Sequence, residues 1–190
     1  MCARFNIDRE VIEEAISQAD TNNPAVQELT GGDIRPTNSS VVLAGHQARI
    51  HAGIMRWGLP RYDGKGLIIN TRSETALEKQ MFRESTLHRR CLIPARVFYE
   101  WDRSKRMVTF SQPDQSLIWM AGIYDESHRF SILTTEANES VSKFHDRMPV
   151  LLSPEDLNRW LFDHTATEKL LAEKMPALLH RQDYEQIALF

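Results

Sequence analysis

The chain is poor in cysteine and has no long apolar run. Cys2 and Cys91 are its two cysteines among 190 residues, too few for a disulfide framework, and free thiols suit a reducing cytosol. No stretch approaches the roughly 18–20 apolar residues that cross a bilayer. The start, Met-Cys-Ala-Arg-Phe-Asn followed by acidic residues, is unlike a secretory signal. These absences predict a cytoplasmic protein with no membrane segment.

Metal-binding patterns are also lacking. The seven His and two Cys residues show no short ligand spacing of the zinc type. We therefore expect no metal site and no cofactor.

Positive charge is scarce at both ends of the chain and concentrated in its middle. The formal net charge is −3, but residues 1–34 carry −5 and residues 107–190 carry −6. Residues 35–106 hold 14 Lys and Arg against 6 Asp and Glu, a net of +8. A basic middle between acidic ends is typical of a phosphate-binding face, although an uneven scatter of solvated charges is the alternative.

Length and composition fit one globular domain over residues 1–190, with 42% hydrophobic and 26% charged residues. The apolar periodicity and the turn residues set the expected elements. We expect helices over 8–19, from 73 past 81, from 153 past 161 and over 167–175, strands over 41–43, 48–57, 67–70, 91–101, 107–110, 117–124 and 129–135, and a loop over 21–40. This order predicts an α+β fold with a β-rich, curled or barrel-like central sheet and flanking helices.

Cys2 carries unusual chemistry because it becomes the first residue when Met1 is removed. A terminal cysteine presents an α-amine and a thiol on adjacent carbons, and both are partly nucleophilic near neutral pH. The amine condenses with an aldehyde to a Schiff base, and the thiol then closes a five-membered thiazolidine. This chemistry indicates a carbonyl substrate, or an amide cleaved by an N-terminal nucleophile.

Three polar residues interrupt apolar, strand-like surroundings. Asn70 ends an apolar strand, Glu100 lies between aromatic residues, and His145 follows Phe144. A carboxylate among aromatic side chains is desolvated, which raises its pKa and suits it to proton transfer near pH 7. Histidine titrates in the same range. Taken singly, each is more often a satisfied structural group.

Seven short motifs occur in order along the chain. They are Met-Cys-Ala-Arg-Phe at the start, Asn-Thr-Arg-Ser-Glu-Thr from Asn70, Arg-Cys-Leu-Ile-Pro-Ala from Arg90, Phe-Tyr-Glu-Trp from Phe98, Ala-Gly-Ile-Tyr-Asp from Ala121, Leu-Thr-Thr-Glu-Ala-Asn from Leu133 and His-Asp-Arg-Met-Pro-Val from His145. In this order and spacing they resemble the SOS-response-associated peptidase (SRAP) family, the abasic-site shielding proteins. The resemblance runs from residue 1 to about residue 162.

The resemblance implies a groove for single-stranded DNA and a covalent thiazolidine crosslink between Cys2 and the aldehyde of an abasic site. The family's catalytic residues fall on Cys2, Asn70, Glu100 and His145. Asn70 would orient the Cys2 terminus, Glu100 would move protons, and His145 would help to open the sugar and to reverse the crosslink. Strand cleavage from the Schiff base would appear as lyase activity, and the peptidase activity would be autocatalytic removal of Met1.

The resemblance also implies a DNA-binding set, in which arginines contact phosphates and tryptophans stack on unpaired bases. The set is Arg4, Pro36, Trp57, Arg72, Trp101 and Arg147. Pro36 matches a loop proline that borders the family's DNA groove. For Trp57, a place in the core is at least an equal alternative. The partner is then single-stranded DNA with abasic sites, bound by a monomer that is nucleoid-associated when on DNA.

The chain departs from the family pattern at a few positions. Ala3 replaces the usual glycine after the cysteine, and Arg96 adds a cation in the segment before Glu100. Gln80 stands where a basic residue is frequent, and the stretch after Met175 lacks the family's usual tail.

Two other functions remain open from the sequence. One is an N-terminal-nucleophile amidohydrolase that acts on a small amide through Cys2. The other is a non-catalytic module that binds single-stranded nucleic acid through the basic middle. Arg72 and Arg147 lie beside the polar residues, which favours crosslinking over an amidohydrolase. Cys2 favours crosslinking over a module that only binds nucleic acid.

Overall fold

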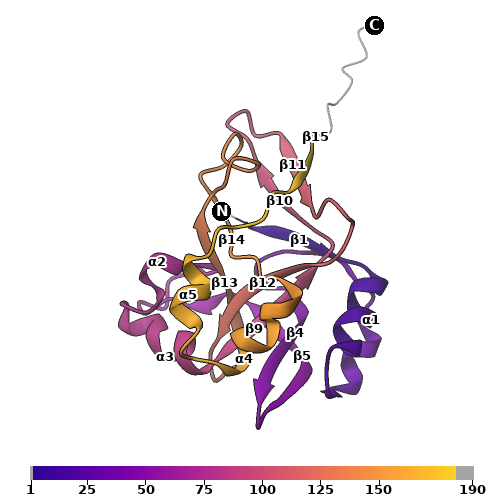
Figure 1. Ribbon diagram of the computed structural model, residues 1–190, viewed down its shortest axis with the longest axis vertical. Coiled ribbons are helices and arrows are strands. Elements are labelled where there is room, and N and C mark those ends of the chain that lie inside the picture. The colour runs from indigo at the N-terminus through magenta and orange to yellow at the C-terminus, as the bar shows by residue number, and fades with distance from the viewer. Residues whose placement is uncertain (1, 183–190) are drawn as a thin grey trace, which may run out of the picture.

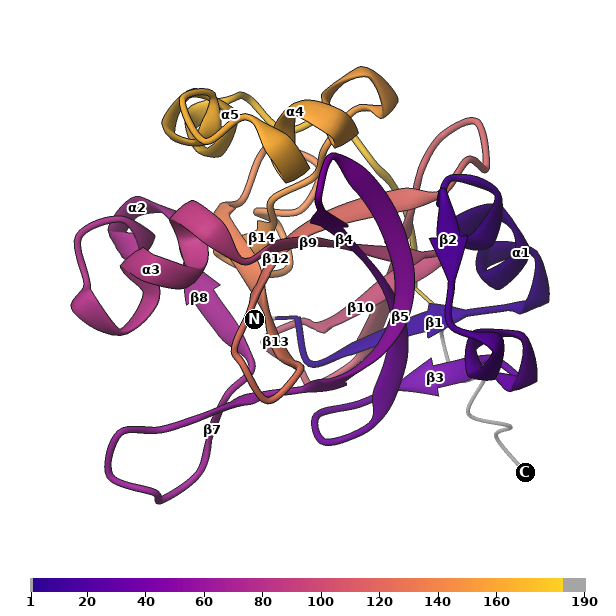
Figure 2. The same cartoon turned by 90° about the horizontal axis from the view of Figure 1, so that it is seen from below.

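Two large β-sheets form the centre of the molecule, with helices around them (Figures 1 and 2). The computed structural model describes residues 2–182. The predicted α+β fold with a curled central sheet is confirmed. No helix in the described part of the chain is long and apolar enough to cross a membrane.

The first sheet is antiparallel and has five strands. Their order is β15 (Leu179–Gln182), β11 (Met107–Ser111), β10 (Val97–Trp101), β1 (Arg4–Ile7) and β3 (Gly32–Ile34). Strand β1 lies inside this sheet, with Phe5 opposite Phe98 on one side and Ile34 on the other. The strand that begins two residues after Cys2 is therefore held along both edges.

The second sheet has eight strands and closes on itself, because β13 pairs with both β12 and β5. Its path is β14 (Arg147–Pro149), β13 (Arg129–Glu136), β12 (Ile118–Tyr124), β9 (Arg90–Ala95), β4 (Ser39–His46), β5 (Arg49–Trp57) and β2 (Thr21–Asn22), and β8 (Asn70–Arg72) pairs with β13. A separate hairpin joins β6 (Leu59–Pro60) to β7 (Leu67–Ile68).

The helices are short and lie around the outside of the sheets (Figure 2). They are α1 (Arg9–Ser17), α2 (Ser73–Ala76), α3 (Gln80–His88), α4 (Leu157–Phe162) and α5 (Thr167–Ala172), with 3₁₀ helices η1 (Pro24–Glu28) and η2 (Pro154–Asp156). Asp8 caps α1 as expected, since its side chain accepts a hydrogen bond from the Val11 N–H.

Several predicted elements differ from the observed ones. The expected loop over 21–40 contains β2, η1 and β3. Ser73 does not cap a helix, because α2 begins at Ser73 itself and ends at Ala76 before α3 starts. The strand predicted over 67–70 is divided between β7 and β8, and the last helix ends at Ala172 rather than near Met175.

Aromatic side chains pack the two sheets against each other. The ring of Phe5, from the first sheet, lies 5.1 Å from that of Trp57 in the second, and Trp57 stacks on Phe130 at 6.1 Å. The Trp57 indole N–H donates to the Ile69 carbonyl at 2.8 Å. The core therefore fixes the backbone immediately before Asn70.

Candidate active site

The four predicted catalytic residues lie where the two sheets meet. Cys2 precedes β1 and Glu100 lies in β10, both belonging to the first sheet. Asn70 begins β8 and His145 lies two residues before β14, and these two strands belong to the second sheet. Residues from distant parts of the chain thus converge through sheet pairing.

Cys2 is fully buried, and its thiol donates to the Arg4 carbonyl oxygen at a sulfur–oxygen distance of 3.7 Å. Burial raises the pKa of the Cys2 thiol, and the negative charge of Glu100 raises it further. The thiol therefore stays protonated at neutral pH until a base removes its proton.

Asn70 holds the backbone of Cys2. Its side-chain N–H donates to the Cys2 carbonyl oxygen at 2.7 Å, and Asn70 is fixed in register opposite Ile132 of β13. Within residues 2–182, the buried Oδ1 of Asn70 has no hydrogen-bond partner. A buried acceptor of this kind is costly unless a donor reaches it.

Glu100 is the buried acid of the site, with 2% of its surface exposed. Burial raises the pKa of its carboxyl group from 4.5 to about 7. A carboxyl group that titrates near neutral pH can both accept and return a proton under working conditions.

His145 lies beside Glu100, with 4.0 Å between its Nε2 and the Glu100 Oε2. The backbone N–H of Arg147 donates to His145 Nδ1 at 3.0 Å. Burial lowers the pKa of His145, which favours the neutral ring. Cys2, Asn70, Glu100 and His145 are thus brought together as the sequence led us to expect.

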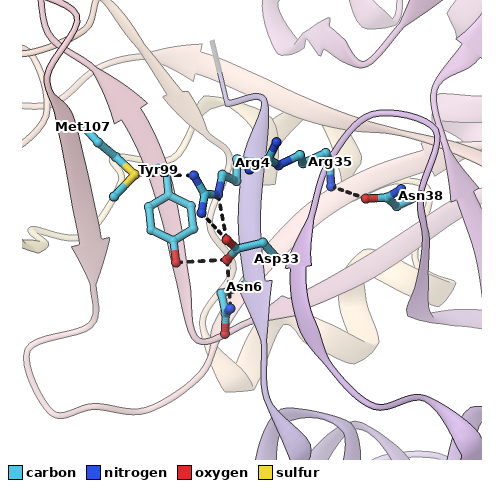
Figure 3. Close-up of polar contacts among 7 residues, drawn as sticks. All are labelled: Arg4, Asn6, Asp33, Arg35, Asn38, Tyr99 and Met107. Carbon is cyan, nitrogen blue, oxygen red and sulfur yellow. Dashed lines mark hydrogen bonds and ion pairs between the residues drawn. The ribbon is translucent and has the colours of Figure 1, made fainter.

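Arg4 forms part of a polar cluster centred on Asp33 (Figure 3). Its Nε donates to Asp33 Oδ2 at 2.9 Å, its Nη2 forms an ion pair with the same oxygen, and its guanidinium carbon lies 4.7 Å from the centre of the Tyr99 ring. Asn6 and the Tyr99 hydroxyl also donate to Asp33. The positive charge of Arg4 is therefore largely matched within the protein.

The positive charge of Arg147 is also balanced by a carboxylate of the protein. Arg147 donates from both terminal nitrogens to the carboxylate of Glu74, at 2.6 and 2.8 Å, and from Nη2 to the Thr134 carbonyl at 2.5 Å. By contrast, Arg72 is exposed. Arg72 acts on the nearby carboxylate of Glu74 through its charge, and no hydrogen bond or close ion pair ties it to a carboxylate among the described residues.

The two predicted tryptophans have different environments. Trp57 has no exposed surface, so its ring cannot stack on a base, and its predicted DNA contact is corrected to a place in the core. Trp101 is 36% exposed and lines a hollow of about 340 Å³ with Arg103, Lys143 and His145. Pro36 is half-buried in the turn before β4.

Arg96 also differs from expectation. Its guanidinium pairs with Asp8 and Glu10 at the start of α1, both at 3.0 Å. It therefore adds no free cation beside Glu100.

Tyr62 is a candidate that the sequence reasoning missed. It is fully exposed at the tip of the β6–β7 hairpin, between Arg61 and Asp63, which form an ion pair, and this hairpin projects beyond the sheets (Figure 2). The signal in the sequence was an aromatic residue in a turn-rich segment.

Metal binding has no support in the described residues. Within residues 2–182, no three His, Cys, Asp or Glu side chains are placed to hold a metal ion.

Known proteins resemble this chain in sequence. The sequence profile of the SOS response associated peptidase (SRAP) family matches residues 1–188. The abasic site processing protein YoaM of Bacillus subtilis is 31% identical over 180 residues, which cover 85% of this chain and 79% of YoaM. The abasic site processing protein YedK of Escherichia coli is 29% identical over 140 residues, which cover 68% of this chain and 63% of YedK.

Solved structures share the fold. A protein from Bacteroides thetaiotaomicron superposes with a TM-score of 0.80 at 21% identity, over 95% of this chain and 91% of its own. A protein from Bordetella bronchiseptica has a TM-score of 0.75 at 24% identity, over 97% of this chain and 100% of its own. With the profile match over nearly its whole length, the chain belongs to the SOS response associated peptidase (SRAP) family.

Proposed function

We propose that this protein processes abasic sites in single-stranded DNA by forming a covalent crosslink through Cys2 once Met1 has been removed. The names of YoaM and YedK support the substrate class. The observation that carries the proposal is the convergence on Cys2: Asn70 donates to the Cys2 carbonyl at 2.7 Å, and the charge of the buried Glu100 carboxyl group acts on the Cys2 thiol.

The reaction needs a carbonyl and the terminal aminothiol alone. The α-amine of Cys2 adds to the aldehyde carbon of a ring-opened abasic site, and loss of one water gives a Schiff base. The thiol sulfur then adds to the same carbon while its proton passes to the imine nitrogen, which closes the thiazolidine. The net change is the joining of aldehyde and aminothiol with release of one water.

The surrounding groups suit these steps. Glu100 accepts a proton from the attacking amine and returns it to the departing hydroxyl group, and it then passes the thiol proton to the imine nitrogen. The Asn70 Oδ1 accepts a hydrogen bond from the new α-amine while its Nδ2 retains the Cys2 carbonyl. His145 assists the opening of the sugar and the reversal of the crosslink.

Two side activities belong to the same proposal. A Schiff base that loses the 3′ phosphate before the ring closes gives strand cleavage, so lyase activity competes with crosslinking. Removal of Met1 by the protein itself is the proposed peptidase activity.

The test is a denaturing gel of untagged protein mixed with single-stranded DNA that carries one abasic site. We expect a shifted band that is lost in Cys2→Ala and retained in Cys91→Ala, which removes the other buried thiol. Mass spectrometry checks that Met1 is absent. No shifted band from protein without Met1 would contradict the proposal and favour an amidohydrolase.

A further inference from the structure

The ion pair between Glu74 and Arg147 joins the two segments that carry Asn70 and His145. Glu74 lies in α2, which follows directly from β8 and Asn70, and Arg147 opens β14 two residues after His145. The pair is bidentate, with the Arg147 side chain 11% exposed and that of Glu74 47% exposed. Bidentate pairs fix geometry, unlike most exposed ion pairs.

The side chain of Arg147 is further tied to the second sheet. Its Nη2 donates to the Thr134 carbonyl of β13, and the register pairs Thr134 with Arg72 of β8. Strand β14 has three residues, and Arg147 is the first of them. These contacts fix the first residue of β14, which is the end of the strand that the His145 loop enters.

The backbone of the same arginine sets the state of the His145 ring. Its N–H donates to Nδ1, so the proton of the neutral ring resides on Nε2, the nitrogen that faces Glu100. The carboxylate of Asp146 also lies 3.0 Å from Nδ1, but its side chain is 84% exposed, so water competes for this contact. The backbone N–H is fixed, and it decides which ring nitrogen carries the proton.

We propose that Glu74 is a positioning residue for the reaction. By holding Arg147, it places the backbone N–H that orients the His145 ring and sets its tautomer beside Glu100. Arg147 then serves the site through its backbone N–H, apart from the phosphate contact that the resemblance implies for its side chain. The kinetic part of this inference rests on the proposed function, whereas the state of the ring does not.

The first test needs no DNA. In ¹⁵N NMR of the imidazole rings, with His145→Gln identifying the signals, we expect an unprotonated Nδ1 in the wild type. Glu74→Gln should shift the ring toward a mixture of tautomers, whereas Glu78→Gln, an exposed neighbour on the same segment, should not. A wild-type ring protonated on Nδ1, or an unchanged ring in Glu74→Gln, would overturn the inference.

The second test separates chemistry from binding. At saturating abasic-site DNA, Glu74→Gln should slow crosslinking by up to about 100-fold, the typical loss for a small misplacement. The affinity for intact single-stranded DNA and its salt dependence should stay as in Glu78→Gln. Unchanged crosslinking with tighter, more salt-dependent binding would instead show that Glu74 competes with phosphate for Arg147.

Folding is checked by thermal unfolding of each variant. If Glu74→Gln fails to fold, Glu74→Asp replaces it, because this change keeps the charge but withdraws the carboxylate by one methylene. Glu74→Asp should then show the same loss of crosslinking rate and the same ring mixture, and a wild-type rate and ring would overturn the inference. A wild-type protein that does not crosslink would contradict the proposed function and leave the NMR test standing.

Discussion

Glu100 is charged or neutral at a physiological pH according to small changes in its surroundings. In the native protein, burial raises its pKa from 4.5 to about 7. The native state therefore binds more protons than the unfolded state between these values. By linkage, this group's contribution to stability is complete below pH 4.5, falls as pH rises toward about 7, and has been lost above it.

Replacing Glu100 with Gln should separate the two consequences of this pKa. The crosslinking rate should fall by about 10²–10⁴-fold, the usual contribution of a general acid–base group. The variant should also lose the decline in stability over this range, which is at most about 1.4 kcal/mol per pH unit for one group. Single-turnover crosslinking and urea unfolding from pH 5 to 8 measure both. An unchanged pH–rate profile would exclude Glu100 as the proton carrier.

Arg72 should make the strongest single electrostatic contribution to DNA binding, because its side chain is exposed, whereas those of Arg4 and Arg147 are held in close ion pairs with Asp33 and Glu74. Arg72→Ala should weaken binding to single-stranded DNA and reduce the slope of log K against log salt by about 0.7. Fluorescence anisotropy at several salt concentrations measures this slope. Arg83→Ala, an exposed arginine on α3, is the control, and an equal effect there would make the contribution of Arg72 non-specific.

The resemblance carried by the seven ordered motifs pointed to Cys2, Asn70, Glu100 and His145 as one set, and the structure places these residues close together. The interaction partners of individual side chains could not be predicted from the sequence. The pairing of Arg4 with Asp33, for example, depends on the register of β1 with β3. The burial of Trp57 likewise depends on Phe5 and Phe130, which come from distant strands.

Among the elements, the β6–β7 hairpin carries an aromatic side chain into solvent. Tyr62 is fully exposed there, between Arg61 and Asp63, and the hairpin leads directly into β8 and Asn70. An exposed aromatic ring is suited to stacking on an unpaired base.

Tyr62→Ala should weaken non-covalent binding to single-stranded DNA by about 1–3 kcal/mol, the value of one base–aromatic stack. Tyr62→Phe keeps the ring and should bind as the wild type does. Titrations of a labelled oligonucleotide compare the three proteins. If the alanine variant bound as tightly as the phenylalanine variant, the hairpin would have no stacking role.

The strand predicted over 91–101 shows what local pattern misses at the scale of elements. Most of its residues are apolar, yet the structure divides it into β9 in one sheet and β10 in the other. The joint is Arg96, whose N–H donates to the Asn6 carbonyl and whose side chain reaches Asp8 and Glu10. Such a change of sheet depends on contacts with α1 that periodicity does not encode.

At the scale of the whole molecule, the basic middle block is less positive on its surface than its net charge suggests. Arg90 is buried and donates to backbone carbonyls, including that of Trp160, and Arg96 and Arg106 pair with carboxylates. Only part of the basic residues between positions 35 and 106 is therefore available for the predicted phosphate-binding face. Strands β1 and β15, from opposite ends of the described residues, lie in one sheet, and a single domain over residues 1–190 stays a prediction.

The placement of β1 between β10 and β3 has a mechanical consequence. In the proposed covalent product, a DNA strand under tension pulls on Cys2 and loads β1 along its own axis. The hydrogen bonds on both sides of β1 then share this force together, in shear, whereas a strand peeled from a sheet edge gives way one bond at a time. The protein would resist being dragged off the captured strand because its anchor is loaded in the direction in which a sheet is strongest.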